Sequence, residues 1–94
     1  MQVNYDFSGK NVLLIGGTTG IGRATALAFA KAGANLYVTG MGKEHGETLR
    51  QEVAGVAKVD YRFAEVDVRD AAAMEQLHND AYKAYDRIDI AFNN

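Results

Sequence analysis

The sequence predicts an α/β fold in which a parallel β-sheet is covered by helices on both faces. Short β-branched, apolar runs alternate along the chain with longer stretches of helical pattern, as they do in sheets with crossover helices. The first run, residues 11–15 (NVLLI), is apolar on both faces of a strand, which is typical of a central parallel strand. With 94 residues, of which 48% are hydrophobic and 23% charged, the chain is expected to form one domain.

The first strand is expected at residues 11–15 and ends at Gly16. A helix is expected to begin at Ile21, because small apolar residues recur at helical spacing and Gly33 follows where a left-handed C-cap is favourable. The residues expected on the buried face of this helix are Ile21, Ala24, Ala28 and Ala32.

The second strand is expected at residues 35–39, closed by residues 40–42 (GMG). Residues 44–53 have the composition of a helix, although the apolar stripe consists only of Leu49 and Val53 and is interrupted by Gly46.

A third strand is expected at residues 61–66 and a fourth at residues 88–92. Between them Asp70 occupies the position of a helix N-cap. The residues expected on the buried face of this third helix are Ala73, Leu77, Ala81 and Ala84.

Right-handed crossovers give these strands the order 3-2-1-4, which is the N-terminal half of a doubly wound, Rossmann-type sheet. Ligands bind such sheets at the carboxyl ends of the strands where the order reverses, here beside Gly16 and Asn93. Residues 1–94 are therefore expected to form a single, partial dinucleotide-binding domain.

The strongest motif is the segment from Gly16 to Gly22, which joins the first strand to the first helix with the spacing G-x-x-x-G-x-G. Glycines permit the tight turn, a close approach of ligand to backbone, and close packing of helix on strand. The helix N-terminus supplies free N–H groups and partial positive charge for a pyrophosphate, and Thr18 and Thr19 add hydroxyl donors. The pattern predicts a dinucleotide site, although a glycine-rich turn without a ligand is the alternative.

A phosphate loop of nucleoside triphosphatases has similar glycine spacing across residues 17–22. That loop needs a lysine for the phosphates and then a serine or threonine for magnesium. Arg23 and Ala24 stand in those positions, so this class is excluded.

Charge and composition exclude several other classes of function. Ten basic against twelve acidic residues, without basic clusters, argue against a nucleic-acid partner. No apolar run is long enough to span a membrane, the start of the chain does not resemble a signal peptide, and cysteine is absent, so a cytoplasmic protein without disulfides is expected. His45 and His78 stand alone in sequence, and no metal site is expected.

Four stretches together resemble the short-chain dehydrogenase/reductase family. They are the lead-in FSGK at residues 7–10, the loop at residues 15–22, the Asp67-Val68 pair after the third strand, and residues 88–94 (IDIAFNN), which resemble the strand leading into the family's N-N-A-G motif. The loop departs from the family's T-G-x-x-x-G-x-G only in having Ile15 in place of the threonine.

The resemblance implies a cofactor-binding part of an oxidoreductase that transfers hydride between a nicotinamide dinucleotide and an alcohol or ketone. It implies that Asp67 and Val68 meet the adenine, with Asp67 accepting from its amine, and that Asn93 steadies the crevice. Taken alone, Asp67 could be a turn residue and Asn93 a strand terminus. The cofactor-binding residues expected in full are Gly16, Thr18, Thr19, Gly20, Ile21, Gly22, Gly40, Met41, Asp67, Val68 and Asn93.

Cofactor choice depends on the end of the second strand, where an acidic residue favours NAD and a basic one favours NADP. Gly40 and Met41 stand there, and Lys43 is close enough to reach a 2′-phosphate. NADP is therefore expected over NAD, although Lys43 could simply be a solvated lysine at a helix start.

No catalytic residue is expected in this chain. The family's Tyr-x-x-x-Lys pair is not found, and Ser8, the single serine, precedes the first strand. The chain is expected to be truncated after the start of the asparagine motif and to expose an edge of Ile88, Ile90 and Phe92, through which it self-associates. The alternatives are a non-catalytic nucleotide-binding module and an inert piece held by oligomer contacts.

Overall fold

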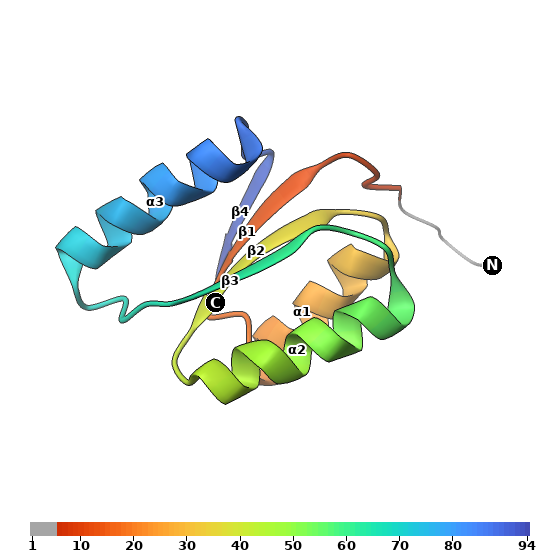
Figure 1. Ribbon diagram of the computed structural model, residues 1–94, viewed down its shortest axis with the longest axis horizontal. Coiled ribbons are helices and arrows are strands. Elements are labelled where there is room, and N and C mark those ends of the chain that lie inside the picture. Colours follow the sequence, from red (N-terminus) through yellow and green to blue (C-terminus); the bar gives the residue numbers. More distant parts are fainter. Residues whose placement is uncertain (1–5) are drawn as a thin grey trace.

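The computed structural model describes residues 6–94. The expectation that the start of the chain is not a signal peptide concerns residues outside this range. The elements alternate as β1 (Asn11–Ile15), α1 (Gly20–Lys31), β2 (Asn35–Gly40), α2 (Lys43–Val56), β3 (Tyr61–Glu65), α3 (Ala71–Tyr85) and β4 (Ile90–Asn93). The strands pair in parallel in the order β3-β2-β1-β4, which confirms the predicted topology (Figure 1).

The sheet has a hydrophobic core on each face, with α1 and α2 covering one face and α3 the other (Figure 1). Successive side chains of a strand point to opposite faces. In β1, Val12 and Leu14 pack toward α1 and α2, whereas Leu13 and Ile15 pack toward α3. This placement explains why β1 is apolar at consecutive positions.

The buried face predicted for the first helix is wrong. Ile21 is 73% exposed, and Ala24 and Ala28 are also exposed. The residues of α1 that are buried are Gly22, Ala26 and Ala30. Alanine and leucine occur on several sides of this helix, so their spacing does not determine a face. The buried face is determined instead by the close packing of the first turn of α1 on the preceding loop, because only glycine fits at position 22.

The start of β4 differs from the predicted start, because side-chain hydrogen bonds take the place of backbone pairing there. β4 begins at Ile90 rather than at residue 88, because Asp89 approaches Asn11 with both its backbone and its side chain. The Asn11 side chain in turn donates to the Arg87 carbonyl at 2.9 Å, which holds the turn before β4. Ile88 still packs into the α3-side core.

Three predicted local features hold. Gly33 has a φ of +97° after α1, and the Asp70 carboxylate caps α3 by accepting from the Ala73 N–H at 3.1 Å. Leu77 and Ala81 are buried on the expected face of α3. The glycine that interrupts the pattern of α2 also has a structural reason: a Cβ at Gly46 would lie 2.5 Å from the Phe63 ring.

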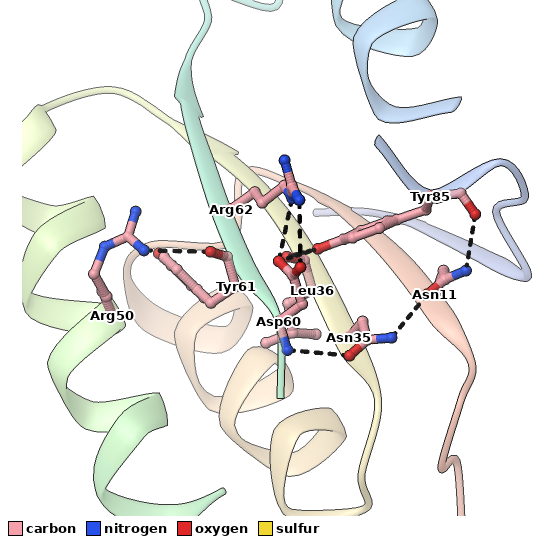
Figure 2. Close-up of polar contacts among 8 residues, drawn as sticks. All are labelled: Asn11, Asn35, Leu36, Arg50, Asp60, Tyr61, Arg62 and Tyr85. Atoms are coloured by element: carbon pink, nitrogen blue, oxygen red, sulfur yellow. Dashed lines mark hydrogen bonds and ion pairs between the residues drawn. The ribbon is translucent and has the colours of Figure 1, made fainter. Parts of the chain in front are cut away.

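The C-terminal end of α3 is joined to the sheet by a polar network at the start of the strands (Figure 2). The Tyr85 hydroxyl oxygen lies 2.8 Å from the Leu36 carbonyl oxygen and 3.2 Å from the Asp60 carboxylate, so these two acceptors share its single proton. The Arg62 guanidinium binds the same carboxylate and lies 5.7 Å from the centre of the Tyr85 ring. Burial, and secondarily Asp60, raise the pKa of Tyr85, so its hydroxyl stays a donor at neutral pH.

Replacing Tyr85 with phenylalanine should lower the free energy of unfolding by about 1–2 kcal/mol, because the Leu36 carbonyl and Asp60 lose a donor. Amide hydrogen exchange in the last turns of α3 should accelerate. Tyr82→Phe is the matched control, because Tyr82 is on the same helix but half exposed. Equal losses of stability in the two variants would show that the network does not hold α3.

Candidate functional site

The loop between β1 and α1 depends on three glycines for two different reasons. Gly16 and Gly20 have φ values of +79° and +57°, in the left-handed region that favours glycine. Gly22 has no room for a side chain, because a Cβ there would lie 2.3 Å from the Gly16 carbonyl oxygen. The N–H groups of Gly16 and Gly17 donate to the Thr39 carbonyl at 3.0 and 2.9 Å, which ties the loop to β2.

The two threonines of the loop have different surroundings. Thr18 is only 6% exposed and lies against Gly40, where a Cβ would approach the Thr18 hydroxyl to 2.5 Å. Thr19 is exposed and is the N-cap residue of α1, but its side chain makes no capping hydrogen bond. Of the two hydroxyls predicted to bind phosphate, that of Thr19 is therefore the accessible one.

The start of α1 presents backbone donors. The first helical hydrogen bond runs from the Arg23 N–H to the Thr19 carbonyl, so the N–H groups of residues 20–22 have no acceptor within the helix. Together with the helix dipole they make a favourable place for an anion.

A hollow of about 360 Å³ lies beside this loop, at the carboxyl ends of the strands. It collects side chains and backbone from residues far apart in sequence. The residues that line it are Gly16, Thr39, Gly40, Met41, Val66, Asp67, Val68, Arg69 and Asn94. Five predicted site residues are thus brought together, namely Gly16, Gly40, Met41, Asp67 and Val68. The other six do not line the hollow: Thr18 is in the loop, Thr19, Gly20, Ile21 and Gly22 form the N-cap and first turn of α1, and Asn93 ends β4.

Asn94 is a site residue that the sequence analysis did not single out. Its N–H donates to the Ile15 carbonyl at 3.0 Å, and its side-chain amide donates to the Gly16 carbonyl at 3.2 Å. Asn93 is exposed one residue earlier, opposite Ile15 in the strand register. Adjacent residues of a strand point to opposite faces of the sheet. Which of the two asparagines meets the glycine loop therefore depends on the residue at which β4 ends.

Asp67 is held by its neighbours. Its carboxylate accepts from the Arg69 N–H at 2.9 Å and from the Arg69 guanidinium at 3.0 and 2.8 Å. These hydrogen bonds, chiefly those of the Arg69 side chain, lower the pKa of Asp67 to about 2. Asp67 is therefore a turn residue, one of the two roles that the sequence left open. Its carboxylate remains an ionised hydrogen-bond acceptor at the rim of the hollow.

The Asp67 carboxyl should titrate near pH 2, and replacing Arg69 with glutamine should raise its pKa toward the ordinary value of about 3.9. Because the folded-state pKa is lowered, any stabilisation by this pair is present above about pH 4 and is lost as the pH falls toward 2. Carboxyl-detected NMR titration measures the midpoint. Arg87→Gln, which removes the partner of Asp89, should leave the pKa of Asp67 unchanged. If Arg87→Gln raised the pKa of Asp67 as much as Arg69→Gln does, the effect would not be specific to Arg69.

Two apolar side chains flank the hollow at its rim. Met41 is 60% and Val68 58% exposed, and they follow β2 and β3 respectively. Exposed apolar side chains beside a hollow offer contact to a flat apolar ring. Lys43 is exposed at the first position of α2.

A larger hollow, of about 740 Å³, lies along the outer edge of β3, at the network of Figure 2. Its arginines already have partners: Arg62 binds Asp60, and Arg50 binds Glu47 and the Tyr61 carbonyl. Size alone therefore does not identify a site there, whereas the smaller hollow is lined by Gly16 of the glycine loop that leads into α1.

No helix within residues 6–94 is long and apolar enough to cross a membrane. In the same stretch no three histidine or acidic side chains are grouped so that they could hold a metal ion.

A sequence model of the family described as short chain dehydrogenase matches residues 10–94. The short chain dehydrogenase/reductase dpmpG of Macrophomina phaseolina is 34% identical over 89 residues, covering 95% of this chain and 51% of that protein. The 3-oxoacyl-[acyl-carrier-protein] reductase FabG of Aquifex aeolicus is 33% identical over 86 residues, covering 92% of this chain and 35% of that protein.

Among solved structures, a short-chain dehydrogenase/reductase of unknown function from Caenorhabditis elegans, determined with cofactor, superposes with a TM-score of 0.82 at 36% identity. The match covers 90% of this chain and 32% of that one. The chain thus spans between about a third and a half of the length of these proteins.

Proposed function

This chain belongs to the short-chain dehydrogenase family, and we propose that it forms the cofactor-binding part of an oxidoreductase. The complete protein would transfer hydride between a nicotinamide dinucleotide and an alcohol or ketone. The observation that carries the proposal is the glycine loop: a Cβ at Gly22 would meet the Gly16 carbonyl at 2.3 Å, so the loop is packed closely against the start of α1. The helix that starts at this loop presents the N–H groups of residues 20–22, which have no acceptor within the helix and favour an anion.

The residues present fit a dinucleotide. The N–H groups of residues 20–22 and the Thr19 hydroxyl would bind the pyrophosphate, with Thr18 and Gly40 shaping the floor beside them. When bound, the cofactor supplies the hydride chemistry, while the protein binds and orients it. Ile21, 73% exposed on the first turn, would contact the cofactor.

The adenosine half would occupy the hollow. Met41 and Val68 would pack against the adenine, and the ionised Asp67 would accept from its exocyclic amine. Three of the carboxylate's acceptor positions are used by Arg69, which fixes its orientation without saturating it. Asn93 and Asn94 would support the crevice from β4.

For the cofactor's identity we propose NADP over NAD. No acid stands at the end of β2, where Gly40 and Met41 are found, and Lys43 at the start of α2 offers a cation to a 2′-phosphate. Replacing Lys43 with glutamine should then weaken NADPH binding more than NADH binding.

Titrating NADPH and NADH against the full chain, while following the fluorescence of the reduced nicotinamide, tests the proposal. Saturable binding of both, tighter for NADPH, is expected. No saturable binding of either would leave an inert piece rather than a cofactor-binding part. Reduction of a ketone is not expected from this chain alone, because no tyrosine in it is followed four residues later by lysine.

We further propose that the chain self-associates through β4. Within the described residues β4 pairs only with β1, and its other edge is free (Figure 1). Free strand edges pair readily with other chains. Sedimentation should show association that rises with concentration, and Ala91→Lys on β4 should weaken it, whereas Ala54→Lys on α2 should not. A monodisperse wild-type monomer with cooperative unfolding would contradict this.

Cytoplasmic location and the lack of nucleic-acid and membrane partners stay predictions of the sequence. Cell fractionation tests the first, and binding assays with DNA, RNA and lipid vesicles test the others.

A further inference from the structure

A carboxylate from β3 reaches the loop that follows β2. Glu65, the last residue of β3, lies opposite Gly40 in the strand register. Its Oε2 accepts a hydrogen bond from the Gly42 N–H at 2.7 Å. Gly42 is the N-cap of α2, with a φ of +89°, so this bond helps hold the turn between β2 and α2.

This turn is the segment on which cofactor choice depends. The end of β2 has no acidic side chain of its own, which favours a 2′-phosphate. The Glu65 carboxylate nevertheless places negative charge within hydrogen-bond distance of that segment. It would act there much as an acid at the end of β2 does.

The charges around the turn oppose one another. Lys43, the first residue of α2, would attract a 2′-phosphate. Glu65 would repel it. Glu44 adds a second carboxylate, with Oε2 3.5 Å from the position of a Cβ on Gly42. The balance of these charges, rather than Lys43 alone, would set the preference between the two cofactors.

We infer that Glu65 is a specificity-determining residue, which limits the preference of the site for NADP over NAD. The inference rests on the proposed function, because it concerns the same dinucleotide site. It differs from a purely structural role, in which Glu65 holds Gly42 and affects both cofactors equally.

Glu65→Gln separates the two roles. The glutamine side chain keeps an oxygen that can accept from the Gly42 N–H but removes the negative charge. Glu65→Ala removes both the acceptor and the charge. Glu75→Gln is the matched control, because Glu75 is an exposed carboxylate on α3, on the opposite face of the sheet from α2.

The experiment measures the affinities of the full chain for NADP⁺ and NAD⁺ by calorimetry, for the wild type and the three variants. Glu65→Gln should raise the ratio of NADP⁺ affinity to NAD⁺ affinity about 3- to 10-fold at low salt, as expected for removing one charge near a phosphate across water. The increase should shrink at about 1 M salt, where charges are screened within about 3 Å. Glu65→Ala should in addition weaken both cofactors, and Glu75→Gln should change nothing.

The inference would be overturned if Glu65→Gln had the wild-type ratio of affinities, or if the change in that ratio did not depend on salt. Glu65 would then have a structural role only. Thermal unfolding of each variant, followed by circular dichroism, verifies that the compared proteins are folded. Failure of the wild type to bind either dinucleotide is a different result: it would overturn the proposed function, and this inference with it.

Discussion

Replacing Gly22 with alanine should abolish dinucleotide binding while also destabilising the fold. The new Cβ would lie 2.3 Å from the Gly16 carbonyl oxygen, 2.9 Å from the Gly17 Cα and 3.0 Å from the Asn94 amide nitrogen. Two of these atoms belong to backbone, which cannot rotate away as a long side chain can. The loop must therefore move away from the start of α1.

We expect the free energy of unfolding to fall by about 1–3 kcal/mol, as is usual for overpacking. Affinity for NADPH should fall by about 100-fold or more, equivalent to about 2.7 kcal/mol of binding free energy. Chemical denaturation and calorimetric titration measure the two effects separately.

Gly55→Ala is the matched control for replacing a glycine in a helix. A Cβ at Gly55 on α2 meets nothing within 4 Å. This variant should keep wild-type affinity and gain up to about 1 kcal/mol of stability. Wild-type affinity in Gly22→Ala as well would show that the loop does not have the close packing described above.

Replacing Leu36 with alanine should have the largest effect on stability. Leu36 is fully buried in the core between the sheet and the helices α1 and α2. Its side chain lies among buried residues of the sheet and of both helices, so the structure can close the resulting cavity only in part. Such substitutions cost about 2–5 kcal/mol, a large share of the total stability of a small domain.

The midpoint of thermal unfolding should fall by at least about 10 °C in Leu36→Ala. Val56→Ala, which removes the same kind of apolar surface from a residue 46% exposed at the end of α2, should change stability by less than about 0.5 kcal/mol. Similar unfolding midpoints for these two variants would contradict the assigned core.

The sheet could be predicted from sequence because each strand carries its own signal. β1 is apolar at consecutive positions only because both of its faces are covered, and crossover handedness then leaves a single strand order. The glycine loop could be predicted for a similar reason, since positive φ at Gly16 and Gly20 is a property of the local backbone.

Features that depend on distant contacts could not be predicted. The buried face of α1 is determined by Gly22 against Gly16, which alanine spacing does not reveal. The role of Gly46 depends on Phe63, 17 positions later in the sequence, on the neighbouring strand. Asn94, not Asn93, contacts the loop because β4 continues through residue 93.

The sequence predicted a set of candidate site residues but not the interactions among them. Asp67 was singled out by its place after the expected third strand, whereas its pairing with Arg69 depends on how the turn is formed. The hydrogen bond from Gly42 to Glu65 likewise depends on the register between β2 and β3, which the sequence does not specify.

NMR shows whether the loop from Gly16 to Gly22 binds a nicotinamide dinucleotide. Amide spectra of the ¹⁵N-labelled chain would be recorded during titration with NADPH. We predict saturable shifts concentrated at Gly16, at residues 19–22 and at Asp67–Val68, with little change at the Tyr85 network on the opposite end of the sheet. Absence of saturable shifts at the loop, or shifts centred instead on the β3 edge, would contradict binding of the dinucleotide at this loop.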